Sequence, residues 1–202
     1  MNADGSNYNV VASDRVGRNV KEQYLFVYDD DKIDVITGTG GYGIEPNDEF
    51  EREPYYVMFR SGNFDFYLFT IHTKPSAVAT EIPALRDAYM DLQNNTPDEN
   101  DIILLGDFNG KAPGVTVGSY ITMDAIAQIP DIIFTINEET NTRGGKAYDN
   151  IVFQSNYTTE YSDSAGVNTF WLSYGLDEDQ GFAISDHKLV WAVFDIRQTD
   201  DD

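Results

Sequence analysis

Short apolar stretches, mostly separated by glycine- and asparagine-rich turns, are the main pattern along the chain. In these stretches apolar residues either alternate with polar ones or follow one another without interruption, and both patterns are typical of β-strands. We predict strands at Tyr8–Ala12, Gln23–Tyr28, Lys32–Ile36, Tyr55–Phe59, Phe64–His72, Ile102–Leu105, Ile132–Ile136, Tyr148–Phe153 and Leu189–Phe194.

One segment has a different period. Within Ala77–Gln93 the apolar residues recur at steps of three and four, which predicts an amphipathic helix. Ser76 is the predicted N-cap of this helix, and Asn94–Pro97 is expected to end it. A shorter helix is predicted over Tyr120–Ile129.

Many strands and few helices predict an α+β fold, in the form of a two-sheet β-sandwich flanked by helices. We expect a single domain over residues 1–202, with residues 197–202 as a disordered acidic tail. Gly38–Phe50 is a long acidic and glycine-rich loop. No apolar run approaches the length of a membrane span, and Met1–Tyr8 has neither the basic nor the apolar region of a signal peptide.

The chain carries 35 acidic and 13 basic residues, which gives it a formal net charge of −22. Such a charge repels nucleic acid and destabilises the compact state at low salt. Near molar salt the Debye length falls to about 3 Å, so the self-repulsion is screened. The charge therefore favours adaptation to high salt, with an acidic interaction surface as the alternative. Because the chain has no cysteine, disulfides and thiol chemistry are excluded.

Polar clusters stand at the ends of four predicted strands. Gly106–Asn109 follows one apolar strand, and His72 ends another. Tyr148–Asn150 opens a third strand, and Asp186 with His187 precedes the last one. A single aspartate at a strand end is more often a turn residue than a catalyst. Together the clusters are more informative, because they contain both histidines of the chain.

These clusters resemble deoxyribonuclease I, within the endonuclease/exonuclease/phosphatase superfamily. The signature stretches run in family order over almost the whole chain. They are Gly17-Arg18-Asn19, Lys21-Glu22-Gln23-Tyr24-Leu25-Phe26, Arg52-Glu53-Pro54, Ile71-His72-Thr73-Lys74-Pro75, Gly106-Asp107-Phe108-Asn109, Ala147-Tyr148-Asp149, Tyr174-Gly175-Leu176 and Ala183-Ile184-Ser185-Asp186-His187. The Gly106 and Ser185 stretches identify the superfamily, and the Glu22 and Arg52 stretches point to the deoxyribonuclease I branch.

The resemblance implies an endonuclease that hydrolyses DNA phosphodiester bonds with Mg²⁺. In this reaction water loses a proton, the leaving 3′ oxygen gains one, and the charge on the phosphate oxygens is neutralised. By resemblance, His187 oriented by Asp149 is the base, and His72 paired with Glu22 is the acid.

The resemblance also implies a set of binding residues. Asp107 and Asn109 would hold the nucleophile and the phosphate, with Asp107 and Asp186 as Mg²⁺ ligands. Arg52 and Lys74 would contact the substrate, since a guanidinium fork suits phosphate oxygens. For Arg52, a surface ion pair with Glu51 or Glu53 is the alternative.

Two structural Ca²⁺ sites are expected from the resemblance. Asp48, Glu53 and the Phe50 carbonyl match one in part. Glu138, Thr140 and Thr142 match the other, with glutamate in place of the usual aspartate. Hard oxygen ligands on loops suit Ca²⁺. In so acidic a chain, the same residues can equally be solvated loop residues.

The lysines provide an observation that is independent of the resemblance. Of six lysines, only Lys32 lies more than three residues from a predicted site residue; the others are Lys21, Lys74, Lys111, Lys146 and Lys188. A surface that has shed positive charge is expected to keep it where a polyanion docks. With so few lysines, coincidence is the alternative.

The chain departs from the family pattern at its N-terminus. The match starts near Ser6, downstream of the strand, helix and strand with which family members open, and the principal Mg²⁺-ligating glutamate belongs to that segment. We therefore expect an N-terminally truncated sandwich, with impaired metal binding and exposed sheet edges that allow self-association. Val20 and Asn150 also replace a tyrosine and an arginine that are common in the family. Members are often secreted, which predicts an extracellular location in high salt.

Two other functions stay open at this stage. One is a phosphodiesterase of the superfamily with another substrate, against which the Glu22 and Arg52 stretches argue. The other is a catalytically inactive fragment or binding module of the same fold. The presence of both histidines and of the acids beside them favours an enzyme.

Overall fold

The computed structural model describes residues 5–117 and 121–199. A seven-stranded sheet forms its centre, with the order β3-β5-β6-β7-β9-β8 and with β4 paired to β5 beside β3. The strands are β3 (Asp34–Val35), β4 (Gly41–Tyr42), β5 (Tyr55–Ser61), β6 (Phe64–His72), β7 (Ile102–Asp107), β8 (Ile132–Phe134) and β9 (Asp149–Gln154). Among the described strands only β6 and β7 pair in parallel, and α1 (Val78–Asn95) crosses over between them.

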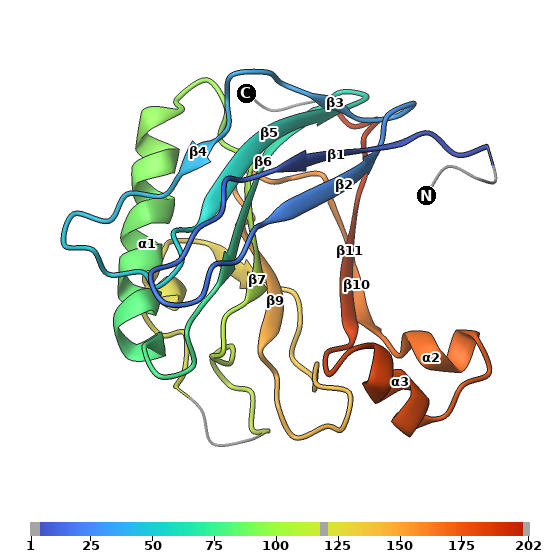
Figure 1. Ribbon diagram of the computed structural model, residues 1–202. Coiled ribbons are helices and arrows are strands. Elements are labelled where there is room, and N and C mark those ends of the chain that lie inside the picture. Colours follow the sequence, from blue (N-terminus) through green and yellow to red (C-terminus); the bar gives the residue numbers. More distant parts are fainter. Residues whose placement is uncertain (1–4, 118–120, 200–202) are drawn as a thin grey trace.

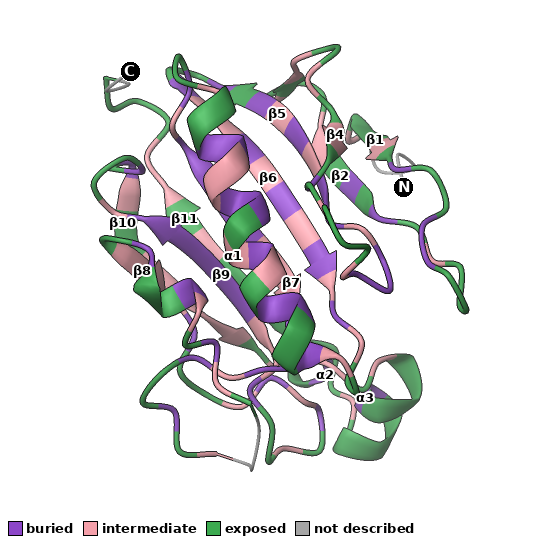
Figure 2. Cartoon of the chain, turned by 90° about the vertical axis from the view of Figure 1, so that its left-hand side faces the viewer, coloured by how far each residue is buried: buried purple, intermediate pink, exposed green. Residues whose placement is uncertain are grey.

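α1 lies on one face of this sheet, as Figures 1 and 2 show. The apolar positions predicted from the three-and-four spacing are buried; they are Val78, Ile82, Leu85, Tyr89 and Leu92. They pack on alternate residues of the sheet, such as Phe69, Ile71 and Leu104. The apolar residues that recur with the helical period of 3.6 and those that recur with the strand period of 2 thus form one core.

The second layer consists of two separate two-stranded sheets. β1 (Tyr8–Ala12) pairs with β2 (Leu25–Asp29), and β10 (Tyr161–Asn168) pairs with β11 (Leu189–Phe194), both antiparallel. Phe26 of β2 packs on Tyr55 and Phe59 of the central sheet. Phe194 of β11 packs on Phe64 and Phe153. The predicted α+β class with two packed β-layers is confirmed.

The helices differ from prediction in several places. No side chain caps α1; its N-cap is Ala77, so the prediction for Ser76 is wrong. Of the helix predicted over Tyr120–Ile129, the structure contains only the 3₁₀ turn η1 (Ile126–Gln128), and Tyr120 lies outside the described residues. Two short helices, α2 (Phe170–Ser173) and α3 (Glu178–Ile184), were not predicted.

The strands β1, β6 and β11 have the predicted bounds, whereas the strand predicted over Lys32–Ile36 shrinks to the two residues of β3. The tail predicted over residues 197–202 is described as far as residue 199. There Arg197 binds Asp195, and Gln198 donates a hydrogen bond to Thr159. In the described part of the chain, no helix has both the length and the apolar character required to cross a membrane.

Candidate active site

Three adjacent strands bring acidic and imidazole side chains to one edge of the central sheet. In the parallel β6–β7 register His72 lies opposite Asp107, and in the antiparallel β7–β9 register Asp107 lies opposite Asp149. Gly106 allows this approach, because its φ is +145° and a Cβ there would lie 2.0 Å from the Ile71 carbonyl oxygen. The strand ends that the sequence singled out therefore meet.

His72 is held by Glu22 from the loop before β2. The Nδ1 atom of His72 lies 2.7 Å from Glu22 Oε2, and Arg52 Nη1 donates to the other oxygen of Glu22 at 2.6 Å. Arg52 Nε donates to the His72 carbonyl at 2.8 Å. The Arg52 side chain is only 7% exposed. Its guanidinium therefore fixes the position of both Glu22 and His72 from the buried side of the pair.

His187 is held in the same way by Asp149. Its Nδ1 atom lies 2.7 Å from Asp149 Oδ2. This hydrogen bond, together with the nearby charges of Asp107 and Asp186, raises the pKa of His187 to about 9. The backbone N–H of Asp149 donates to the Thr140 hydroxyl, which fixes the start of β9.

Asp107 lies between the two imidazoles. Its Oδ2 atom is 3.5 Å from His72 Nε2 and 3.9 Å from His187 Nε2. Burial and the charge of Asp149 raise the pKa of Asp107, while a hydrogen bond from the Asn109 N–H to its Oδ1 lowers it. Asn109 has a φ of +44°, and its side chain donates to the Thr73 carbonyl. The Nε2 atoms of both histidines thus lie near one carboxylate.

A cleft of about 520 Å³ opens over these groups. Six predicted site residues line it: His72, Asp107, Asn109, Asp149, Asp186 and His187. Five further residues complete the lining: Pro75, Asn141, Lys146, Tyr148 and Ser185. The Lys146 ammonium lies 5.1 Å from the centre of the Tyr148 ring. The second group of residues was not predicted as site residues, although Lys146 stood out in the distribution of the lysines. The cleft thus contains cationic, imidazole and carboxylate groups.

The two predicted substrate-binding cations have protein partners. Arg52 pairs with Glu22, and with neither of the two neighbours that the sequence suggested. The Lys74 ammonium lies 2.9 Å from Glu51 Oε2, and the hydrogen bond between them lowers the pKa of Glu51 to about 2. Neither residue lines the cleft.

The predicted metal ligands are distributed over three places. Asp107 and Asp186 line the cleft together. Asp48 pairs with Arg18 at 2.7 Å, and the buried Glu53 Oε2 has no hydrogen-bond partner among the described residues. In residues 5–117 and 121–199, no three or more His, Cys, Asp or Glu side chains form a group that could hold a metal ion by themselves.

The third place is the loop that carries Glu138, Thr140 and Thr142. Glu138 is exposed and Thr140 is fully buried. The Thr142 hydroxyl donates to the Ser185 carbonyl, and the Lys188 N–H donates to the Thr140 carbonyl. These threonines therefore tie the segment around His187 to the segment before β9.

Mg²⁺ is commonly held by one or two protein carboxylates together with waters and substrate phosphate. The oxygens of Asp107 and Asp186 fit Mg²⁺ in type and number. Since burial and the neighbouring Asp149 make the charge of Asp107 unfavourable, a cation there would relieve an existing repulsion.

Known proteins resemble the chain in both sequence and structure. Deoxyribonuclease-1 of Ovis aries is 36% identical over 202 residues, which cover 93% of this chain and 76% of that protein. Deoxyribonuclease-1 of Sus scrofa is 34% identical over 93% of this chain and 69% of its own length. Deoxyribonuclease gamma of Mus musculus is 34% identical, over 89% of this chain and 61% of its own. No protein-family model matches the chain.

Among solved structures, the endonuclease domain of the retrotransposon TRAS1 has a TM-score of 0.62 at 16% identity, over 95% of this chain and 80% of that one. An endonuclease/exonuclease/phosphatase family protein of Bacteroides thetaiotaomicron has a TM-score of 0.57 at 14% identity, over 96% and 75%. The solved structures show that this chain shares their fold. The deoxyribonuclease-1 sequences, at 34–36% identity, show that the chain is related to them by descent. The chain belongs to the deoxyribonuclease I family.

Proposed function

We propose that the protein is a metal-dependent endonuclease that hydrolyses phosphodiester bonds of DNA. The observation that carries this proposal is the pair of imidazoles at one cleft. Each is held at Nδ1 by a carboxylate 2.7 Å away, and the Nε2 atoms of both lie within 3.9 Å of Asp107. A hydrolysis that uses one general base and one general acid can place these two roles on two such imidazoles.

In this proposal Asp149 keeps the proton of His187 on Nδ1, so that Nε2 can accept a proton from water. Glu22 orients His72, whose Nε2 gives a proton to the leaving oxygen. A base must be neutral, whereas a pKa of about 9 keeps His187 protonated at neutral pH. The hydrogen bond with Asp149 is the main cause of that pKa, and the negative charges of Asp107 and Asp186 add to it. Neutralising Asp107 and Asp186 would therefore lower the pKa of His187 and favour its neutral form.

Asp107 and Asp186 would hold Mg²⁺, which when bound neutralises charge on the non-bridging phosphate oxygens. Asn109 would contribute an amide group to the same phosphate. Arg52 is proposed to act through Glu22, because its guanidinium is buried against that carboxylate. Lys74 contacts substrate in this proposal only after exchanging Glu51 for a phosphate.

Structural Ca²⁺ is proposed at Glu53 with Asp48, and at the loop of Glu138, Thr140 and Thr142. The unpartnered Glu53 oxygen supports the first site, but Arg18 must leave Asp48 before the ion binds. The measurement is the melting temperature with and without Ca²⁺ in the presence of excess Mg²⁺. A rise that Glu53→Gln removes would support the first site, and an unchanged value would contradict both.

DNA is the proposed substrate because the sequence relatives are named deoxyribonucleases. A structural neighbour is TDP2 of D. rerio, whose structure contains a single-strand DNA product. Its TM-score against this chain is 0.59 at 13% identity, over 94% of this chain and 77% of that one. The net charge of −22 supports a setting of high salt, which screens the repulsion between protein and DNA. We extend this to an extracellular, salt-rich location.

The experiment that tests the function is nicking of supercoiled plasmid in about 1 M KCl, where the Debye length is about 3 Å. The reactions contain Mg²⁺ and Ca²⁺, and a chelator is the first control. Asp186→Asn is compared with Asp163→Asn, a matched change on β10 outside the cleft lining. We expect nicking that the chelator and Asp186→Asn abolish and that Asp163→Asn leaves intact. A folded chain that binds the plasmid without nicking it would instead be a binding module.

A further inference from the structure

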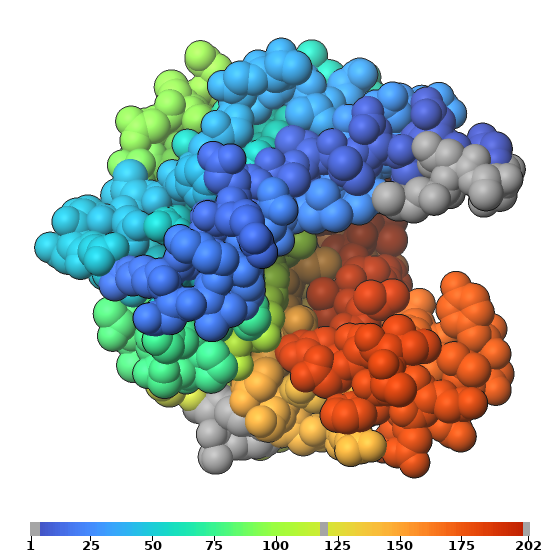
Figure 3. Space-filling view, in the orientation of Figure 1, coloured from blue at the N-terminus to red at the C-terminus, as the bar shows by residue number. Residues whose placement is uncertain are grey.

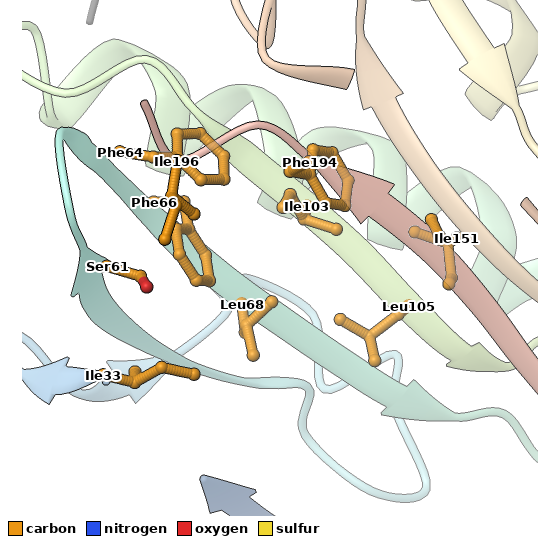
Figure 4. Close-up of a pocket in the computed structure, with 11 residues that line it drawn as sticks. Ile33, Ser61, Phe64, Phe66, Leu68, Ile103, Leu105, Ile151, Phe194 and Ile196 are labelled. Carbon is orange, nitrogen blue, oxygen red and sulfur yellow. The ribbon is translucent and has the colours of Figure 1, made fainter. Parts of the chain in front are cut away.

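Two pockets outside the cleft differ in what their walls offer a ligand. One, of about 270 Å³, lies over β6, β7 and β9, and its only polar lining side chain is Ser61 (Figure 4). Because Ser61 already donates to the Lys32 carbonyl, the lining of this pocket contains no group that selects a ligand. The other pocket, of about 340 Å³, combines aromatic rings with a carboxylate. Its chemistry is specific enough to identify a class of ligand.

The second pocket lies between α1 and the segment that contains β4. Figure 1 shows β4 beside α1, and Figure 3 shows the same light-blue segment next to the green of the helix. Tyr42 of β4, Tyr56 of β5 and Tyr67 of β6 line the pocket, together with Asp91 of α1. We call it the tyrosine pocket. None of these four residues lines the cleft, so the tyrosine pocket is a separate site.

Glycines hold the β4 segment close to the sheet and to the helix. A Cβ at Gly41 would lie 2.6 Å from the Tyr56 hydroxyl oxygen. A Cβ at Gly43 would lie 2.9 Å from the Phe69 ring and 3.1 Å from Ala88 Cβ. Glycine, which has no side chain, allows such a close approach of the backbone. The β4 segment also pairs with β5, so this wall of the tyrosine pocket is formed before any ligand binds.

The aromatic rings offer surfaces that attract a cation. The rings of Tyr56 and Tyr67 lie at 76° to each other, with their centres 5.9 Å apart. Tyr67 is buried and Tyr56 is half-buried. The face of an aromatic ring carries partial negative charge and attracts a cation within about 6 Å of the ring centre. Because two rings at nearly a right angle line one pocket, a single small cation can contact both.

Asp91 adds a full negative charge to the rings. In the described part of the chain Asp91 forms no salt bridge, and the nearby Arg86 pairs with Asp87 instead. Burial raises the pKa of the Tyr56 hydroxyl, and the charge of Asp91 raises it further, so the carboxylate acts at the rings. The tyrosine pocket therefore has a carboxylate available as a counter-charge.

The neutral polar groups of the tyrosine pocket are already used. The Thr39 hydroxyl donates to the Ile36 carbonyl and accepts from the Met58 N–H. The Thr96 hydroxyl and the Asn95 side-chain amide both donate to backbone carbonyls of α1. A ligand rich in hydroxyl groups, such as a sugar, would leave some of them buried without partners, which costs free energy. A cation without N–H donors avoids this cost.

We propose that the tyrosine pocket binds a small alkylated ammonium cation. Its trimethylammonium group would lie against Tyr56 and Tyr67, with Asp91 as the counter-charge. Aromatic rings are the usual protein partners of quaternary ammonium groups, which have no N–H to satisfy. Ile44 and Leu92, which also line the pocket, offer apolar surface to the methyl groups. The net charge of −22 attracts any cation, but only an alkylated one also uses the rings and the apolar wall.

The test compares choline with its neutral isostere, 3,3-dimethyl-1-butanol. Each is titrated into the folded chain in about 1 M KCl, where the Debye length is about 3 Å, and binding is followed by calorimetry and by NMR of the tyrosine ring signals. We expect saturable one-to-one binding of choline and about tenfold weaker binding of the isostere, which lacks the charge. Absence of choline binding, or equal binding of the two compounds, would overturn the proposal.

Variants locate the binding. We expect Asp91→Asn and Tyr56→Leu each to weaken choline binding about tenfold. Asp98→Asn removes the same charge from an exposed residue just after α1, outside the pocket lining, and is the matched control. Tyr56 also packs on Phe69, so circular dichroism accompanies each variant, and the half-buried Asp91 gives a test that leaves the core intact. If Asp98→Asn weakens binding as much as Asp91→Asn, the attraction is general and the tyrosine pocket is not the site.

A trimethylammonium group is found both on free solutes and on lipid headgroups, and the proposal commits to a free solute. We therefore expect choline to bind and phosphatidylcholine vesicles not to sediment with the protein. Sedimentation with vesicles that Asp91→Asn abolishes, without binding of free choline, would identify a lipid headgroup and overturn the proposal. None of these readouts needs nuclease activity, so a failure of the proposed function leaves this test unaffected.

Discussion

The two histidine–carboxylate pairs have the same distance but different surroundings. Both Nδ1–carboxylate distances are 2.7 Å. Glu22 forms an ion pair with the buried Arg52. Asp149 binds His187, and the charges of Asp107 and Asp186 also act on that imidazole. Each pair also connects the central sheet to a different two-stranded sheet, because Glu22 precedes β2 and His187 precedes β11. We propose that the charged groups around each pair, and not its hydrogen-bond distance, set whether its imidazole acts as acid or base.

Both imidazoles are expected to be necessary for catalysis. We predict that His187→Ala and His72→Ala each lower the nicking rate by about 10²- to 10⁴-fold, the range for general acid–base groups. The measurement is single-turnover nicking with circular dichroism for each variant. If only one substitution lowers the rate, the two pairs do not act as acid and base.

The second prediction concerns the guanidinium that distinguishes the pairs. Glu22→Gln leaves the buried Arg52 charge without its carboxylate, while Asp149→Asn leaves no cation of that kind behind. We expect Glu22→Gln to lower the free energy of unfolding by about 2 kcal/mol. This is less than the ~3–5 kcal/mol of fully buried pairs, because the Glu22 side chain is 32% exposed. Urea unfolding measures it, and Glu22→Gln with Arg52→Met should recover part of the loss.

The third prediction is the pH dependence of stability. The folded-state pKa of His187, about 9, lies above its ordinary value of 6.5. Its contribution is therefore complete below about pH 6.5 and is lost as the pH rises through about 9. One pKa unit corresponds to about 1.4 kcal/mol, and for this partly exposed imidazole we expect about 1 to 2 kcal/mol after solvent screening.

Urea unfolding at pH 6 and pH 10, with wild type compared to His187→Gln, measures this contribution. The difference in unfolding free energy between the two proteins should be large at pH 6 and small at pH 10. Asp149→Asn should flatten the profile of the wild type, because Asp149 is the main cause of the shift. A difference that grows with pH would contradict the assignment.

The sequence predicted the elements whose signal is local. The apolar runs of β6 and β11 and the spacing in α1 identified those elements. β10 escaped prediction because Ser162, Asp163 and Gly166 weaken its pattern and only pairing with β11 makes it a strand. For α3 a usable signal was present, since Asp177 and Gln180 form a capping box.

The candidate site shows a similar division. The clusters at strand ends were visible in the sequence, whereas the pairing of Glu22 with His72 joins residues 50 positions apart, and only the resemblance suggested it. The partners of Arg52 and Lys74 depend on how loops pack, which no pattern in the chain specifies. Lys146 was visible only as one of five clustered lysines.

Two lysines near the site, Lys146 and Lys74, are expected to differ modestly in their effect on DNA binding. Lys146 lines the cleft beside Tyr148, while the Lys74 ammonium is bound to Glu51. We predict that Lys146→Gln raises KM a few-fold with little change in kcat and lowers the slope of log affinity against log salt by about one, as for one phosphate contact. Lys74→Gln, the variant for comparison, should change the slope less, because phosphate must first displace Glu51 from that ammonium. Equal slopes for both variants would mean that DNA displaces Glu51 from Lys74, so both lysines would contact phosphate.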